Sequence, residues 1–313
     1  MVLVEPEEGR LGLVSREALT FARQLGDRVH ALVLGAADEA VLADCRELGV
    51  AVVHVADNPE LERYAAAAWG TALSQAAGTA RAGILLAGGT PKGTEVLAHV
   101  AARYRRPMAA NVVEVQSTEP LEVERQVAGG SVLERVRLEV PAILTMAGHA
   151  VDPEPAPAPG AAEVRRFTAT LRPGDLRAQV VRTERTEQGD SSALTSARVV
   201  VGAGRGAGGP DGFAGVEALA KRLGGAVGVS RVVTSLGWRP HHEQVGQTGS
   251  RIAPDVYIAC GISGAIQHWA GCASSKTIIA INTDPDAPMV TKADYAVIGD
   301  MHEVIPAILE ELG

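Results

Sequence analysis

Short apolar runs alternate with helical patterns through the first third of the chain, and this alternation constrains the possible folds most strongly. Three runs have the length and apolar content of buried strands, at residues 29–34, 51–55 and 83–86. Helical patterns flank them at about residues 15–25, 38–48, 58–75 and 93–103. Strands joined by helices predict a parallel sheet with right-handed crossovers and a helix layer on each face.

Consecutive strands replace this alternation in the next part of the chain. Four stretches there favour extended structure, at residues 112–115, 121–127, 131–138 and 142–146. A turn at Ala128-Gly129-Gly130 separates two of them. We expect a small antiparallel addition at the edge of the first sheet.

Four prolines alternate with small and acidic residues over residues 152–160. Proline lacks the backbone donor that helices and sheet ladders need, so this stretch predicts an extended linker over residues 152–166. The chain of 313 residues is long enough for two domains, expected at residues 1–151 and 167–313.

The second domain repeats the alternation of strand and helix. Apolar strands are expected at residues 197–201, 226–229, 256–260 and 277–281, and helices at residues 212–223 and 301–312. The predicted fold class is α/β, with two doubly wound, mostly parallel-sheet domains, of which the first has the antiparallel strand addition.

Composition excludes several classes of function. The net charge is −8, and no basic stripe marks a nucleic-acid surface. No apolar run approaches the roughly 20 residues of a membrane helix, so an integral membrane protein is not expected. The cysteines Cys45, Cys260 and Cys272 are far apart and form no metal-type pair, which predicts a reducing, cytoplasmic compartment. The amino terminus has no signal-peptide pattern.

A glycine- and serine-rich turn after the apolar run at residues 256–260 carries the main functional signal. The turn and the following helix start read Gly261-Ile262-Ser263-Gly264-Ala265-Ile266-Gln267-His268. A helix start offers unpaired backbone N–H donors and the positive end of the helix dipole, which favours an anionic ligand. Gln267 and His268 are expected in the first helical turn. A second polar loop reads Gln244-Val245-Gly246-Gln247-Thr248-Gly249.

Polar residues also follow the other predicted strands of the second domain. Ligands of open α/β sheets bind at the carboxyl ends of the strands. The residues in such positions are Arg205, Ser230, Arg231, Ser263, Gly264 and Asn282. Taken singly, Arg205 and Arg231 are as consistent with ordinary surface arginines as with ligand-binding residues. Four polar strand ends on one edge favour a binding site.

A glycine-rich loop after the first strand of this domain contains G-x-G-x-x-G at Gly204, Gly206 and Gly209. A plain connector is the default interpretation, because the dinucleotide fingerprint also needs an acidic residue about 20 positions later. Ser230-Arg231 stands there instead. This disfavours NAD and suits a negatively charged or electron-rich ligand group.

Other candidates for metal or catalytic sites have simpler explanations. Asp284 and Asp286 lie in an Asp-Pro turn, and Asp300 is placed to cap the last helix. His241 and His242 lack a third metal ligand at suitable spacing, and no nucleophile stands with a general base. The sequence therefore predicts no metal site and no catalytic residue.

The motifs of the second domain resemble those of the electron-transfer flavoprotein alpha subunit. The resemblance is carried by residues 244–249, 253–259, 261–268, 271, 279–282, 284–288 and 293–295. It implies an FAD held mainly by the second domain, and a beta subunit that completes the dimer and carries AMP. The first domain then corresponds to a nucleotide-hydrolase-like, partner-binding domain without a cofactor of its own.

The resemblance also implies contacts to FAD residue by residue. Arg205 and Ser263-Gly264 would approach the pyrophosphate, and Asn282 and Asp300 the adenosine end. Arg231 would lie over the isoalloxazine ring, Thr248 near N5, and His268 near the pyrimidine carbonyl, where a cation and a donor raise the potential of the ring. The full implied set is Arg205, Ser230, Arg231, Gln244, Val245, Gly246, Gln247, Thr248, Gly261, Ile262, Ser263, Gly264, Ala265, Gln267, His268, Asn282 and Asp300.

The function implied by the resemblance is that of a one-electron carrier. It would take electrons from flavin dehydrogenases, such as the acyl-CoA dehydrogenases of fatty acid β-oxidation, and pass them to a quinone oxidoreductase. Two alternatives stay open: a subunit of an NADH-oxidising, electron-bifurcating flavoprotein complex, and a nucleotide-binding regulatory module without a redox role.

Overall fold

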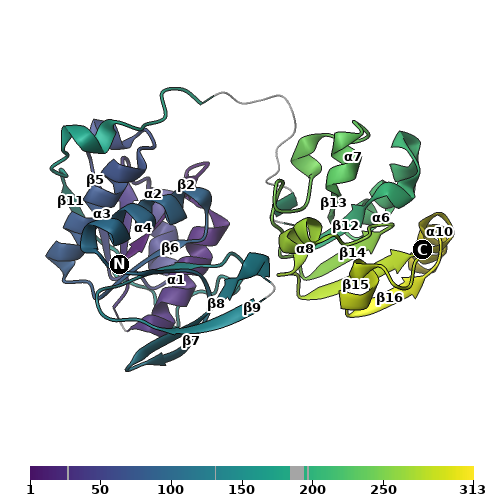
Figure 1. Cartoon of the computed structure of the whole chain (residues 1–313). Coiled ribbons are helices and arrows are strands. Elements are labelled where there is room, and N and C mark those ends of the chain that lie inside the picture. The colour runs from purple at the N-terminus through teal and green to yellow at the C-terminus, as the bar shows by residue number, and fades with distance from the viewer. Residues whose placement is uncertain (27, 131, 184–193, 196) are drawn as a thin grey trace. The chain divides into compact units, whose positions relative to one another are not determined.

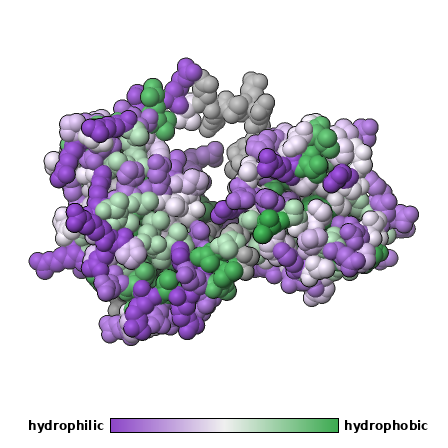
Figure 2. All heavy atoms as spheres, viewed as in Figure 1, coloured by the Kyte–Doolittle hydropathy of each residue, from purple (hydrophilic) through white to green (hydrophobic). Residues whose placement is uncertain are grey.

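The computed structural model describes residues 1–26, 28–130, 132–183, 194–195 and 197–313, and these form two compact units (Figure 1). The first unit comprises Met1–Val127 and Leu133–Glu184, and the second Ala128–Val132 and Arg185–Gly313. Among the described residues, no helix combines the length and apolar character needed to cross a bilayer. Hydrophilic side chains dominate the visible surface of both units, between smaller apolar patches (Figure 2).

A nine-stranded sheet forms the centre of the first unit. Its spatial order is β11-β5-β4-β1-β6-β10-β7-β8-β9. The ladders from β11 to β7 are parallel, and β7 pairs with β8 antiparallel. The strands are β1 (Val2–Leu3), β4 (His30–Leu34), β5 (Val52–Ala56), β6 (Ile84–Gly88), β7 (Met108–Thr118), β8 (Leu121–Val127), β9 (Val132–Arg137), β10 (Ala142–Met146) and β11 (Glu163–Phe167). A short antiparallel pair joins β2 (Pro6–Glu7) and β3 (Arg10–Leu11).

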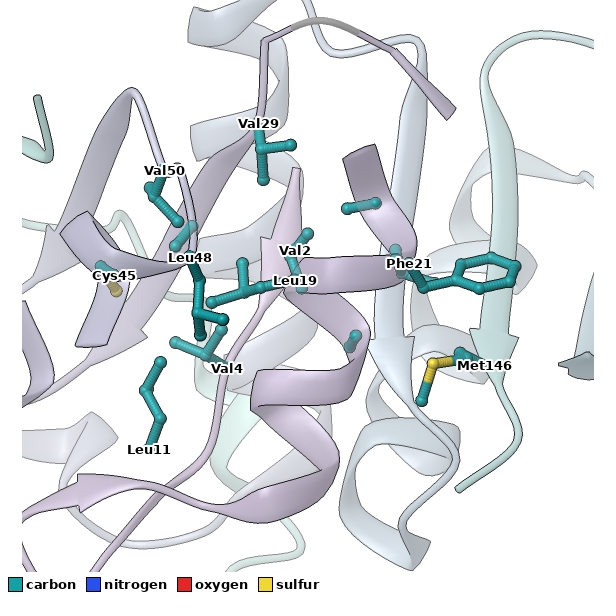
Figure 3. Close-up of a cluster of buried hydrophobic side chains, with 14 of the residues drawn as sticks. Val2, Val4, Leu11, Leu19, Phe21, Val29, Cys45, Leu48, Val50 and Met146 are labelled. Carbon is teal, nitrogen blue, oxygen red and sulfur yellow. The ribbon is translucent and has the colours of Figure 1, made fainter. Parts of the chain in front are cut away.

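Helices cover both faces of this sheet because successive strand residues point to opposite sides. Val2 belongs to one apolar cluster, with Leu19 and Phe21 of the covering helix, and Leu3 belongs to a second cluster on the other face. Figure 3 shows Val4, Leu19 and Leu48 of the first cluster pointing toward one another. The helices are α1 (Leu13–Leu25), α2 (Glu39–Glu47), α3 (Ala66–Ala80) and α4 (Pro91–Tyr104), and the predicted helix at 58–75 divides into the 3₁₀ turn η1 (Pro59–Leu61) and α3.

The antiparallel addition is smaller than the sequence predicted. Strands β7 and β8 lie toward one edge of the sheet, as expected. Strand β10 was also expected in this addition, but it lies inside the sheet, parallel to both β6 and β7. All five of its residues are buried, which suits an interior strand covered on both faces.

The proline-rich segment is a part of the first unit rather than a free linker over residues 152–166. The backbone N–H groups of Ala156 and Gly160 donate to carbonyls of α2, at 2.9 and 2.8 Å. Residues 163–167 then form β11, which pairs in parallel with β5. Proline prevents ladder pairing only where it stands, so the chain regains a strand as soon as the prolines end.

The segment after β11 is also anchored to the first unit. The carboxylate of Asp175, in the 3₁₀ turn η3 (Pro173–Leu176), accepts hydrogen bonds from Thr71 Oγ1 of α3 at 2.9 Å and Arg103 Nη2 of α4 at 2.8 Å. The Arg172 backbone N–H donates to the same carboxylate at 3.0 Å. Residues 167–183, which were expected at the start of the second domain, therefore belong to the first unit.

The second unit contains a five-stranded sheet of order β13-β12-β14-β15-β16, and every ladder in it is parallel. Apolar clusters on its two faces confirm the doubly wound fold. The strands are β12 (Val199–Ala203), β13 (Ala226–Val229), β14 (Val256–Cys260), β15 (Thr277–Asn282) and β16 (Tyr295–Ile298). The helices are α6 (Ala214–Arg222), α7 (Arg231–Ser235), α8 (Ile266–Cys272), α9 (Pro288–Lys292) and α10 (Met301–Leu312), with 3₁₀ turns at η4 (Arg205–Ala207), η5 (Pro210–Phe213) and η6 (His241–Glu243).

The anchoring role of Asp175 can be tested by Asp175→Asn. The substitution removes the charge opposite Arg103, and we expect it to lower the free energy of unfolding of the first unit by about 2 kcal/mol. Urea denaturation followed by circular dichroism measures the change. Glu39→Gln is the matched control, because Glu39 pairs with Arg46 on the surface and such pairs contribute about 0–1 kcal/mol. Equal effects of the two substitutions would contradict the anchoring role.

Candidate functional site

The carboxyl ends of five parallel strands form one edge of the sheet in the second unit. Backbone hydrogen bonds continue beyond the strands and tie the loops of this edge together. Gly204 N–H donates to the Cys260 carbonyl at 3.0 Å, and Gly206 N–H donates to the Gly261 carbonyl at 3.1 Å. Gly261 N–H in turn donates to Ile281 at 2.8 Å. The loops after β12 and β14 are therefore joined to each other and to the end of β15.

A cavity of about 390 Å³ lies along this edge. Seven of the residues that the sequence assigned to a ligand line it: Arg205, Ser230, Gly261, Ile262, Ser263, Asn282 and Asp300. Since these residues follow five different strands, the cavity runs along the whole edge. Such a shape suits an elongated ligand.

A second cavity of about 420 Å³ is lined by Arg231, Gln244 and Thr248 from the predicted set. Its other lining residues are Thr234, Ser235 and His241. Ser230 lines the first cavity and the adjacent Arg231 lines the second. Adjacent residues at the end of β13 therefore line both cavities.

Both arginines of the site are available to an anion. Arg205 and Arg231 are exposed, and neither guanidinium makes an ion pair or hydrogen bond within the described part of the chain. The nearby Ser230 hydroxyl is buried and has no partner among the same residues. Because an unpaired buried hydroxyl costs about 1–3 kcal/mol, such groups concentrate where a ligand supplies the missing partner.

The loop at residues 244–249 is held against α8 by its backbone. Gln247 N–H donates to the Gln267 carbonyl at 2.7 Å, and Ile252 N–H donates to the Gly271 carbonyl at 2.7 Å. A Cβ on Gly271 would stand 2.3 Å from the backbone nitrogen of Gly246, so the close contact needs glycine in the helix. This contact brings the two predicted ligand-binding segments together.

Hydrogen bonds orient the polar groups of this loop. Gln244 is buried, and its side-chain amide donates to Thr248 Oγ1 at 3.0 Å. Thr234 Oγ1 donates to Gln244 Oε1 at 2.6 Å. Thr248 Oγ1 already accepts the bond from Gln244. The Thr248 hydroxyl is exposed, so it can direct its proton to a ligand in the second cavity.

His268 lies in the first turn of α8, as predicted, and is buried there. Burial lowers the pKa of its imidazole to about 4, against a smaller opposing effect of the Val245 carbonyl, so the ring is neutral at neutral pH. Its Nδ1 atom is buried and has no hydrogen-bond partner in the described structure. Gln267 beside it is exposed.

Some predicted site residues lie outside the two cavities. They are Val245, Gly246, Gln247, Gly264, Ala265, Gln267 and His268. Backbone contacts explain several of these positions. The residues of the loop at 244–249 contact α8, and Ser263-Gly264 contact the start of α9. Helix α8 begins at Ile266, so Ser263-Gly264 lie in the turn that precedes the helix.

The simpler explanations of the acidic residues are confirmed. Asp284 Oδ1 accepts from the Asp286 backbone N–H at 3.0 Å, which is an Asx turn. Asp300 Oδ1 accepts from His302 N–H at 2.9 Å and caps α10. Asn282 is also partly engaged, since its amide donates to the Ile262 carbonyl at 3.0 Å. No group of three or more potential metal ligands occurs among the described residues.

Sequence reasoning missed several residues of the cavities. Thr234 and Ser235 lie on α7, and Met301 begins α10. None of them belongs to a motif with a recognisable chemistry. Their only available signal was their position close to a predicted strand end or helix start.

The contact between Gly246 and α8 can be tested by Gly271→Ala. The added methyl group has no room, so we expect the loop at residues 244–252 to be displaced, at a cost of about 1–3 kcal/mol in the free energy of unfolding. Faster hydrogen exchange at the amides of Gln247 and Ile252 measures the displacement. In the control Gly78→Ala in α3, the methyl group meets nothing within 4 Å, and stability should be unchanged or slightly higher. Unaltered exchange in Gly271→Ala would show that the contact is dispensable.

Two family models match this chain. The model of the electron transfer flavoprotein domain matches residues 1–171. The model of the electron transfer flavoprotein FAD-binding domain matches residues 193–273, which include both arginines and His268.

Relatives match over nearly the whole length. The electron transfer flavoprotein subunit alpha of Mycobacterium tuberculosis is 38% identical, over 100% of this chain and 97% of the relative. That of Thermoanaerobacterium thermosaccharolyticum is 34% identical, over 99% of this chain and 96% of the relative. Protein FixB of Clostridium saccharobutylicum is 35% identical, over 99% of this chain and 95% of the relative. This chain belongs to the electron transfer flavoprotein alpha-subunit family.

Proposed function

We propose that this chain is the FAD-carrying subunit of a heterodimeric electron carrier. With a beta subunit that holds AMP, it takes electrons from flavin dehydrogenases, such as acyl-CoA dehydrogenases, and passes them to a quinone oxidoreductase. Members of this family carry electrons and do not convert substrates. The first unit serves as the partner-binding domain. The cysteines, which are free and buried, are consistent with work in the cytoplasm.

The observation that carries this proposal is the set of unpaired polar groups at the carboxyl edge of the second sheet. Two exposed arginines and the buried Ser230 hydroxyl lie there without protein partners in the described residues. They fall inside the segment matched by the model of an FAD-binding domain. A diphosphate in the first cavity would pair Arg205 and Ser230, and a flavin ring in the second cavity would pair Arg231.

The charges along the edge fit the different parts of FAD. Arg205 and Ser230 would hold the diphosphate, while the carboxylate of Asp300 beyond β16 would accept from ribose hydroxyls. In the second cavity, Arg231 and the Thr248 hydroxyl would face the ring. Bound FAD supplies the redox chemistry. The chain supplies a positive charge and neutral donors where the ring gains negative charge, which favours reduction.

Purification of the chain together with its beta-type partner tests the proposal. A yellow complex with FAD that takes up electrons in two separate one-electron steps on titration with dithionite supports the carrier. Direct bleaching by NADH would favour the bifurcating alternative. A complex that stays colourless after addition of FAD would overturn both redox functions and leave the regulatory nucleotide-binding module.

Arg205→Ala tests the placement of the diphosphate. Loss of a charge-assisted hydrogen bond should weaken FAD binding by roughly tenfold to a hundredfold, measured by fluorescence quenching in the FAD-depleted complex. Arg198→Ala is the matched control, since Arg198 is paired with Asp255 immediately before β12, at the opposite edge of the sheet. Its FAD affinity should stay within about twofold of the unmodified complex. An Arg205→Ala complex that binds FAD as tightly as the control would contradict the placement.

A further inference from the structure

A buried tyrosine contacts the histidine of the site. Tyr257, in β14, is fully buried, and its hydroxyl lies 2.8 Å from Nε2 of His268. The two rings are tilted by 31° with their centroids 6.1 Å apart. The contact joins the interior of the sheet to the first turn of α8. The sequence pattern does not predict this contact, because Tyr257 resembles the other apolar residues of the strand.

The neighbouring strand leaves space for this hydroxyl. Gly202 of β12 lies beside it, and a Cβ at that position would stand 2.3 Å from the Tyr257 oxygen. Any larger residue at this interior strand position would displace the tyrosine. The phenol ring and its hydroxyl are therefore confined to one position, with His268 as the polar neighbour.

The direction of the hydrogen bond follows from counting protons. Burial raises the pKa of Tyr257 well above its ordinary value, with smaller contributions from Cys272 and Cys260, so the phenol keeps its proton. The neutral imidazole of His268 has one N–H and one lone pair. If Nε2 carried the N–H, the tyrosine proton would have no acceptor in the described structure. If Tyr257 donates instead, Nε2 accepts and the imidazole proton lies on Nδ1.

Nδ1 is the nitrogen that makes no well-formed hydrogen bond among the described residues, although the Val245 carbonyl is close enough to raise the pKa of the imidazole. We propose that Tyr257 is a positioning residue, whose hydroxyl holds His268 as the Nδ1–H tautomer and so presents Nδ1–H as a neutral donor to the flavin. The inference rests on the proposed function, because the flavin is the acceptor that completes the chain from Tyr257 through His268. A neutral histidine differs here from a charged one, because it offers a hydrogen-bond donor without placing a positive charge in the protein interior.

Nitrogen NMR of the heterodimer labelled with ¹⁵N-histidine tests the tautomer, with His268→Gln used only to assign the signal. At pH 7 we expect a protonated, pyrrole-type Nδ1 and a pyridine-type Nε2 in the unmodified complex. Tyr257→Phe should shift His268 to a mixture of tautomers. A pyrrole-type Nε2 in the unmodified complex would overturn the proposal, and this spectrum decides even if Tyr257→Phe does not fold.

FAD binding gives the second readout. In the FAD-depleted complex, Tyr257→Phe should weaken FAD affinity by about twofold, for an even mixture of tautomers, to about tenfold, if roughly one molecule in ten keeps Nδ1–H, because only that tautomer offers a donor at Nδ1. Tyr104→Phe is the matched control: its hydroxyl contacts the Ser74 carbonyl at 3.5 Å in the first unit, and we expect neither readout to change.

The outcomes separate the two proposals. An unmodified complex that binds FAD, with equal affinity in Tyr257→Phe and an unchanged tautomer, would overturn the positioning role and leave the proposed function standing. A complex that binds no FAD would overturn both.

Discussion

Of the five parallel strands of the second unit, all but the exposed edge strand β16 pack against apolar layers on both faces, and the functional site depends on this constraint. Val201 and Ile258 pack on one side, and Val200 and Tyr257 on the other. Polar groups placed on either face would need buried partners. The residues free to contact a ligand are therefore those just beyond the strands, where the backbone leaves the sheet. Parallel pairing brings all five of these exits to one edge.

Close backbone packing then converts this edge into a site. The loop at residues 244–249 approaches α8 so closely that only glycine fits at position 271, and backbone hydrogen bonds join the loops after β12 and β14 to each other and to the end of β15. Within this frame three buried polar atoms remain unpaired among the described residues: Ser230 Oγ, His268 Nδ1 and His242 Nδ1. Each costs about 1–3 kcal/mol in the free protein, which is a reason to expect a ligand to pair them.

Local patterns predicted most strands because each is a short apolar run bounded by turn residues. The run at 256–260 became β14 without any shift of its ends. One error concerns strand partners, since β10 was recognised as a strand but lies between β6 and β7. Another concerns an element, since the strand at 163–167 follows the prolines directly and was assigned to the linker. Strand order depends on contacts between distant residues, such as those that anchor Asp175 to α3 and α4. Periodicity contains no information on these contacts.

Local sequence patterns were sufficient to predict the α/β class, the doubly wound second unit, the strand-end positions of Arg205, Ser230, Arg231 and Asn282, and the resemblance to a flavoprotein family. The packed structure was needed to show that the first unit extends past the prolines, that α8 starts at Ile266, and that Tyr257 contacts His268. Helix and strand propensities depend on residues that are near neighbours in the sequence. The contact between a tyrosine hydroxyl and a histidine beside Gly202 depends instead on the packing of three separate segments.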